Sequence, residues 1–139
     1  MMYRIERTIT DFNWDEILAV YHAVGWTRHT LKNLQTIYSN SSHVVAAYAD
    51  NRLVGMGRAL SDGVFNAAIY DVIIHPKFQG KGIGKLVVED LLFQLKDVSC
   101  VHLISTTGNE PFYEKAGLKR VKTAMARYLN KGLEAEYLV

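Results

Sequence analysis

The sequence has almost no cysteine and no long apolar segment. Its single cysteine, Cys100, excludes a disulfide within the chain and is typical of a reducing compartment. No apolar run reaches the length that crosses a membrane, and the opening segment MMYRIERTITD lacks the apolar stretch of a signal peptide. We therefore expect a cytoplasmic protein with no membrane contact, in which Cys100 is a small core residue and not a nucleophile.

A strong charge of one sign is also missing. The 16 Lys and Arg residues are nearly balanced by 14 Asp and Glu residues, which leaves a formal net charge of +2. This balance provides no strong field that would attract nucleic acid. The five histidines are His22, His29, His43, His75 and His102. They show no metal-ligand spacing, so we expect neither a nucleic-acid partner nor a metal site.

The chain is long enough for one domain with a real core. It has 139 residues, of which 49% are hydrophobic, and it has only two prolines and no obvious repeat or low-complexity stretch. We therefore expect a single domain over residues 1–139.

The order of predicted elements indicates a three-layer α/β domain with a mixed sheet. Alternation predicts strands at 3–8, 43–49, 52–61, 65–75 and 101–105, with one or two more at 119–129. Asp50 and Asn51 are a hairpin signal, so the strands between 43 and 75 include antiparallel pairs. Helical spacing predicts helices from Thr10 or Asp11 to about Gly25, at 30–38 and at 83–96. A further helix is expected to be capped by Asn109 and to end before Gly117.

The segment QGKGIG at 79–84 lies where a strand runs into a helix. The first N–H groups of a helix have no partner within it, and the helix dipole favours negative charge at that end. Glycine lets the backbone approach a phosphate closely, and Lys81 and Lys85 add positive charge. The segment therefore predicts a pyrophosphate site, although a purely structural turn remains an alternative.

Two common nucleotide loops do not fit this segment. The nucleoside-triphosphate loop needs Gly at position 79 and Ser or Thr after Lys85, where the chain has Gln79 and Leu86. The dinucleotide fingerprint fails because its third glycine comes one residue early. An ATP- or NAD-binding domain is therefore disfavoured.

Two motifs resemble the GNAT superfamily of N-acetyltransferases. IYDVIIHPKFQGKGIGKLVVEDLL at 69–92 is similar to the signature segment of that family, and NEPFYEKAGL at 109–118 is similar to its second motif. The resemblance implies a three-layer α/β/α domain around a mixed, mostly antiparallel sheet. It also implies acetyl-CoA as co-substrate, with its pyrophosphate in the glycine loop and its pantetheine arm paired with the strand. The implied contacts are Val72, Ile73, Ile74, Gln79, Gly80, Lys81, Gly82, Ile83, Gly84, Lys85, Asn109 and Phe112.

A narrower resemblance concerns the acceptor. AVGWTRHTLKNL and FNAAIYDVIIHP look like the bacterial and plant-chloroplast branch that includes plant-type serotonin N-acetyltransferases. That branch acetylates small primary amines, so an arylalkylamine or polyamine is the expected acceptor. Trp26, Tyr38 and Tyr70 are the expected acceptor contacts, although Trp26 could equally anchor a loop.

Acetyl transfer to an amine needs a base, and Asp71 is the first candidate. It is an acid within the apolar strand AIYDVII, and a buried carboxylate without a partner is costly. Two structural alternatives remain open: an ion pair with an Arg or Lys at the core edge, or a hydrogen bond at a bulge. His75 is the second candidate, and an exposed structural histidine is the more favoured interpretation of it.

Tyr113 is the candidate acid. A phenol with a pKa of about 10 is protonated at neutral pH and can give its proton to a thiolate. In the family the tyrosine of this motif commonly points at the thioester sulfur. A tyrosine that is merely packed for its area is the alternative.

Other functions also remain open. Acetylation of a protein lysine or N-terminus would use the same fold, and an acyl-CoA-binding module without catalysis is a third hypothesis. A homodimer is common in the family, and the alternating segment at 119–129 could pair between chains.

Overall fold

The computed structural model describes residues 2–139, which form two compact units. The first ends at Leu103 and the second runs from Ile104 to Val139. The expectation of a single domain over the whole chain stays a prediction. No helix among residues 2–139 is long and apolar enough to span a membrane.

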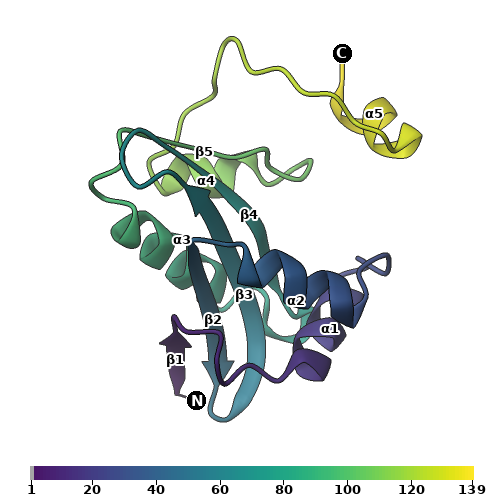
Figure 1. Cartoon of the computed structure of the whole chain (residues 1–139), viewed down its shortest axis with the longest axis vertical. Helices are drawn as coiled ribbons and strands as arrows, with labels where there is room; N and C mark the ends of the chain where they lie inside the picture. Colours follow the sequence, from purple (N-terminus) through teal and green to yellow (C-terminus); the bar gives the residue numbers. More distant parts are fainter. Residues whose placement is uncertain (1) are drawn as a thin grey trace. The chain divides into compact units, whose positions relative to one another are not determined.

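A five-stranded sheet forms the centre of the first unit (Figure 1). Its strands are β1 (Tyr3–Glu6), β2 (His43–Ala49), β3 (Arg52–Ser61), β4 (Asn66–Ile74) and β5 (Cys100–His102). They follow the order β1-β2-β3-β4-β5, with antiparallel pairing up to β4 and parallel pairing between β4 and β5. The mixed, mostly antiparallel sheet is therefore confirmed.

Local chemistry explains the two hairpins of this sheet. Asp50 and Asn51 join β2 to β3, and Asp50 has a φ of 53°, a conformation that Asp adopts more readily than most residues. In the next turn the Asp62 carboxylate oxygen Oδ1 accepts hydrogen bonds from the backbone N–H groups of Val64 and Phe65, both at 2.8 Å. These bonds turn the chain from β3 into β4.

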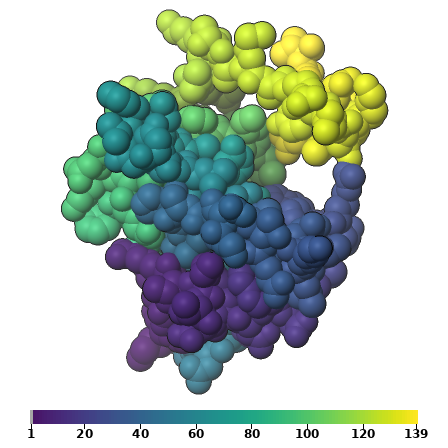
Figure 2. Space-filling model, viewed as in Figure 1, coloured from purple at the N-terminus to yellow at the C-terminus, as the bar shows by residue number. Residues whose placement is uncertain are grey.

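Helices cover both faces of the sheet. On one face lie α1 (Trp14–Ala23) and α2 (Leu31–Ser39), and α3 (Ile83–Gln94) packs against the other. Figure 2 shows the molecule from the same side as Figure 1, and there the purple and blue segment that contains α1 and α2 covers much of this face of the sheet. The three-layer α/β/α arrangement is therefore confirmed.

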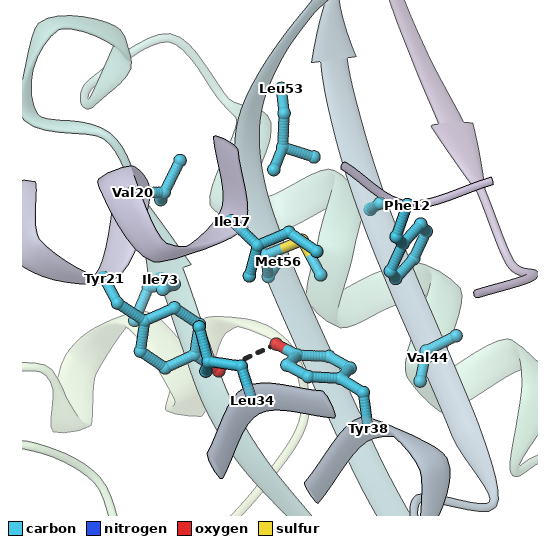
Figure 3. Packing of buried hydrophobic residues seen from close by; sticks show 11 residues of the cluster. Phe12, Ile17, Val20, Tyr21, Leu34, Tyr38, Val44, Leu53, Met56 and Ile73 are labelled. Atoms are coloured by element: carbon cyan, nitrogen blue, oxygen red, sulfur yellow. Dashed lines mark hydrogen bonds between the residues drawn. The ribbon is translucent and has the colours of Figure 1, made fainter. Parts of the chain in front are cut away.

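Two hydrophobic clusters hold the layers together. Figure 3 shows the first cluster, in which Ile17 and Tyr21 of α1 and Leu34 and Tyr38 of α2 pack onto Met56 of the sheet. The second cluster lies between the sheet and α3 and is built from small and branched residues: Val45, Ala47, Val54, Ile69, Val87 and Leu91. Burial of these side chains is the main stabilising term of the first unit.

The caps differ in part from those expected. Asn13, not Thr10 or Asp11, caps α1, because its side chain accepts from the N–H of Glu16. Thr30 caps α2 as expected, and Gly25 follows α1 with a φ of 90°.

The second unit contains α4 (Glu110–Lys115) and α5 (Lys131–Tyr137). Pro111 lies in the first turn of α4 and Gly117 follows it with a φ of 101°, as the sequence predicted. The strands expected at 119–129 are wrong for the described chain, which has no strand there. A strand needs a neighbour to pair with, and this unit supplies only helices.

The prediction that Cys100 is a core residue is also wrong. The residue is exposed and begins β5, which is only three residues long. Its burial was inferred from the apolar sequence that follows it, but a short strand at the end of a sheet exposes alternate side chains.

Candidate functional site

The glycine segment connects β4 to α3 in the first unit. β4 ends at Ile74, a short 3₁₀ turn covers Pro76–Phe78, and α3 begins at Ile83. Gly80 and Gly82 have φ values of 77° and 84°, and a Cβ at either position would contact nothing within 4 Å. Glycine is thus required here for its backbone conformation and not for lack of space.

The start of α3 carries no side-chain cap. Gly82 is the N-cap residue and, having no side chain, cannot accept from the first N–H groups of the helix. Residues 79–82 are exposed, and so is Lys85, which pairs only loosely with Glu89 at 3.8 Å. Free N–H groups, a helix dipole and two nearby lysines together make a site for an anion.

Gln79 and His75 both stabilise the turn before α3. The Gln79 side chain donates from Nε2 to the Ile74 carbonyl oxygen at 2.9 Å. His75 accepts from the N–H of Lys77 through Nδ1 at 3.1 Å, and its ring packs edge-on against Phe78. Desolvation, together with the charges of Arg52 and Lys77, lowers the pKa of His75. These contacts favour a structural role for His75.

Beside this turn, one edge of β4 has no strand partner. Pairing between β4 and β5 ends at Ala68 and His102, so the stretch from Val72 to Ile74 is paired only with β3 in the described chain. Unpaired main-chain N–H and C=O groups on a strand edge can bind an extended ligand that carries amides.

A bulge interrupts β4 at Asp71. The register with β3 shifts between Met56 and Arg58, so that Gly57 faces two residues of β4. Asp71 has a φ of 55°, a left-handed conformation that costs an L-residue about 1–2 kcal/mol.

A buried polar cluster surrounds Asp71. Arg58 donates from Nε and Tyr21 from its hydroxyl to the same oxygen, Asp71 Oδ2, both at 2.9 Å. The Tyr21 and Tyr38 hydroxyls share a hydrogen bond of 2.8 Å, which Figure 3 shows as a dashed line. The side chains of Arg58 and Asp71 are only 13% and 14% exposed. Of the alternatives for Asp71, the structure contains both the ion pair and the bulge.

The two tyrosines of this cluster are held in their protonated forms. Burial, together with Tyr38 and Asp71, raises the pKa of Tyr21. Burial also raises the pKa of Tyr38. Tyr21 therefore serves as a lasting hydrogen-bond donor to Asp71.

Sequence reasoning missed Tyr21 and Arg58 in this cluster. The available signal was Arg58 itself, the one charged residue within the strand stretch LVGMGRAL. Such a position usually indicates a buried partner.

The expected acceptor contacts have different surroundings. Tyr38 is fully buried, so its side chain is not accessible for direct contact with a substrate. Trp26 is half-buried, packs edge-on against Tyr21 and stacks on His29. Tyr70 is 44% exposed, and the Arg58 guanidinium lies 5.0 Å from its ring centroid. Only Tyr70 combines substantial exposure with a direct contact to the polar cluster.

An open hollow of about 440 Å³ lies along the same strand. It is lined by polar residues including Asn40, Ser42 and His102, and by Ala68 of β4. Ala68 and Tyr70 point to the same face, because alternate residues of a strand share a face.

Three expected site residues belong to the second unit. Asn109 precedes α4, but its side chain donates to Thr106 and does not cap the helix. Phe112 and Tyr113 follow, with ring centroids 5.0 Å apart. Burial raises the pKa of Tyr113 above its ordinary value. The other expected residues, from Trp26 to Lys85, belong to the first unit.

Comparison with known proteins decides the family. The model of the acetyltransferase (GNAT) family matches residues 9–118, which is most of the chain. The chain belongs to the GNAT family. The GNAT resemblance of the two sequence motifs is thereby confirmed, whereas the plant serotonin branch is not.

Individual GNAT relatives agree with this result. An uncharacterized N-acetyltransferase of Pyropia yezoensis is 38% identical over 113 residues, covering 77% of this chain and 65% of the relative. A histone acetyltransferase of Glycine max is 33% identical over 117 residues, covering 75% of this chain and 51% of the relative. The chain thus spans between half and two thirds of the length of these relatives.

A solved GNAT structure agrees over nearly the whole chain. The GNAT family acetyltransferase from Streptococcus pneumoniae superimposes with a TM-score of 0.80 at 26% identity, covering 94% of this chain and 99% of that one. The architecture described above is therefore the GNAT fold.

Proposed function

We propose that this GNAT protein transfers the acetyl group of acetyl-CoA directly to a primary amine. The observation that carries the proposal is the glycine loop with its uncapped helix start, next to the unpaired edge of β4. The two features suit the two ends of one ligand, a pyrophosphate and an amide-bearing arm.

The pyrophosphate would bind at the start of α3. Gly80 and Gly82 leave the cradle free of side chains, and Lys81 and Lys85 add charge from exposed positions. Gln79, Ile83 and Gly84 complete the loop, with the Gln79 side chain bonded to Ile74.

The pantetheine arm would pair with β4 at Val72, Ile73 and Ile74. Each pantetheine amide can bond to a strand edge as a further strand would. A backbone N–H of the same stretch would stabilise the oxyanion formed when the amine attacks the thioester. Asn109 and Phe112 are the further acetyl-CoA contacts that the family resemblance implies.

The chemical step needs a neutral amine and a protonated leaving group. An alkylamine with a pKa of about 10.4 is only about 1 part in 2500 neutral at pH 7, which corresponds to about 4.6 kcal/mol. A base, acting directly or through water, would remove this cost, and Asp71 is the sequence candidate for it. Tyr113 would donate its phenolic proton to the departing thiolate.

A small amine is the proposed acceptor, of the arylalkylamine or polyamine type. The support is the resemblance to the plant-type serotonin branch and the open hollow on the same face as Tyr70. Trp26 would contribute through its exposed part. A protein amine is the second candidate, favoured by the relative named as a histone acetyltransferase.

Titration calorimetry tests the donor first, with acetyl-CoA against ATP and NAD. We expect binding in the micromolar range for acetyl-CoA alone, and tighter binding of ATP or NAD would overturn the proposal. Release of free thiol from acetyl-CoA would then be followed with arylalkylamines, polyamines and a lysine-containing histone peptide. Binding without turnover on any acceptor would instead support a non-catalytic acyl-CoA-binding module.

A further inference from the structure

The bulge at Asp71 adopts a backbone conformation that needs support. A left-handed φ at a residue other than glycine persists only when the surrounding structure holds it in place. At Asp71 this support comes from the side chain itself, since Arg58 and Tyr21 both bond to its Oδ2.

The supporting side chains are themselves fixed. Tyr21 is fully buried and bonds to Tyr38, which is also fully buried. Arg58 donates a second hydrogen bond to Ser41, just after α2, at 3.3 Å. Asp71 is thereby tied to α1, to β3 and to the segment that follows α2.

The position of the bulge determines which way β4 faces beyond it. After Asp71, Ile73 points into the first cluster, whereas Val72 and Ile74 point toward the second. A shift of one residue would exchange these faces and rotate the free main-chain groups with them.

The opposite strand is shaped to fit the bulge. A Cβ at Gly57 would lie 2.6 Å from Val87 and 3.0 Å from Leu91 of α3. α3 therefore packs directly onto the sheet opposite the bulge, through Val87 and Leu91 in the body of the helix.

We propose that Tyr21, Tyr38 and Arg58 are positioning residues, which act through Asp71 to hold the edge of β4 open for the acyl donor. Asp71 is then an anchor for the bulge and not the general base. This inference rests on the proposed function, because it needs acetyl-CoA as the ligand of that edge.

The decisive comparison is Asp71→Gly against Asp71→Ala. Both variants lose the carboxylate and leave Arg58 without its partner, but glycine adopts the left-handed conformation freely and alanine does not. We expect the glycine variant to bind acetyl-CoA at least fivefold more tightly than the alanine variant by calorimetry. Equal binding by the two folded variants would overturn the inference.

Kinetics separate positioning from proton transfer. Asp71→Asn keeps a side chain that tolerates this conformation but cannot act as a base. We expect its kcat to stay within about fivefold of wild type, with the same dependence on pH from 6 to 9. A hundredfold loss of kcat together with loss of the pH dependence, at unchanged affinity for acetyl-CoA, would identify Asp71 as the base and overturn the inference.

The positioning residues are tested by Arg58→Met and Tyr21→Phe. We expect the KM and Kd for acetyl-CoA to rise about tenfold, with a smaller change in kcat. Arg7→Met is the matched control, because it removes the ion pair with Asp90 elsewhere in the same unit and should leave both constants unchanged. Tyr21→Phe removes only one hydroxyl, so it keeps the test informative where Arg58→Met fails to fold.

Acetyl-CoA binding by the wild type and by the variants distinguishes a failure of the proposed function from a failure of this inference. No binding of acetyl-CoA by the wild type overturns the proposed function and this inference with it. Normal binding by the wild type and by both positioning variants overturns the inference alone.

Discussion

Tyr113 is the residue on which proton return to the leaving thiolate would depend. Burial raises the pKa of its phenol, so the hydroxyl stays protonated through the neutral range. We predict that Tyr113→Phe lowers kcat by about 100-fold, the usual contribution of a general acid. The measurement is thiol release between pH 6 and 9.

Tyr128→Phe is the control for this prediction, because Tyr128 stacks on Tyr137 in the same unit and belongs to no expected site. An unchanged kcat in Tyr113→Phe would remove Tyr113 from the mechanism.

His75 makes the stability of the protein sensitive to acid. Its pKa is lowered in the folded protein, whereas the unfolded chain has the ordinary value of about 6.5. Between these two values the unfolded state binds more protons, so stability is present above pH 6.5 and falls as the pH drops toward the folded pKa. We predict that His75→Asn reduces this loss. The measurement is the thermal unfolding midpoint of the wild type and of His75→Asn from pH 7.5 to 5. If the midpoint falls equally steeply with pH in the two proteins, the prediction is contradicted.

The β4–α3 connection is the element that would hold most of the proposed acyl-donor site. Gly82 has a positive φ, so Gly82→Ala should cost about 1 kcal/mol of unfolding free energy through backbone strain. It also places a methyl group at the uncapped start of α3, and we predict at least tenfold weaker binding of acetyl-CoA. Urea unfolding and calorimetry measure the two effects.

Gly63→Ala is the matched control for this element. Gly63 has a φ of 80° and, as at Gly82, a Cβ added there would meet no atom within 4 Å, but it lies in the turn between β3 and β4. Gly63→Ala should lose a similar amount of unfolding free energy and bind acetyl-CoA as tightly as the wild type. If Gly82→Ala and Gly63→Ala bind acetyl-CoA equally tightly, the glycine loop is only a structural turn.

The elements that could be predicted from the sequence are those with local signals. Glycines, caps and apolar spacing act within a few residues, so the loop at 79–84, the helices α1 to α4 and the hairpins were found, whereas α5 was not predicted. The pairing of Arg58 with Asp71 and the left-handed bulge depend on strand register, which the sequence alone does not give. At 119–129 apolar and polar residues do alternate as in a strand. The sequence alone could not show whether another strand lies beside this segment to pair with it.

At the scale of the whole molecule, every residue of the buried core lies in the first unit, between Phe12 and Leu95. In the second unit Met125 is 95% exposed and Leu129 81% exposed, within the alternating segment at 119–129. We propose a homodimer in which this segment pairs between chains.

Light scattering tests the homodimer. We predict a mass of about twice 15.7 kDa for the wild-type protein and the monomer mass for Met125→Asp with Leu129→Asp. A mass of 15.7 kDa for the wild type at all concentrations would contradict the proposal.

Each strand of the sheet lies beside the strand that follows it in the chain. β2, β3 and β4 are joined by short turns, so their contacts close small loops and can form early in folding. Arg58 and Asp71 both lie in this three-stranded meander, whereas Tyr21 reaches Asp71 only after α1 has docked. We therefore predict that Arg58→Met mainly slows refolding and Tyr21→Phe mainly speeds unfolding, as stopped-flow chevron plots would show. The bulge that we propose holds the acyl-donor edge open would thus be set before the helices that cover it are in place.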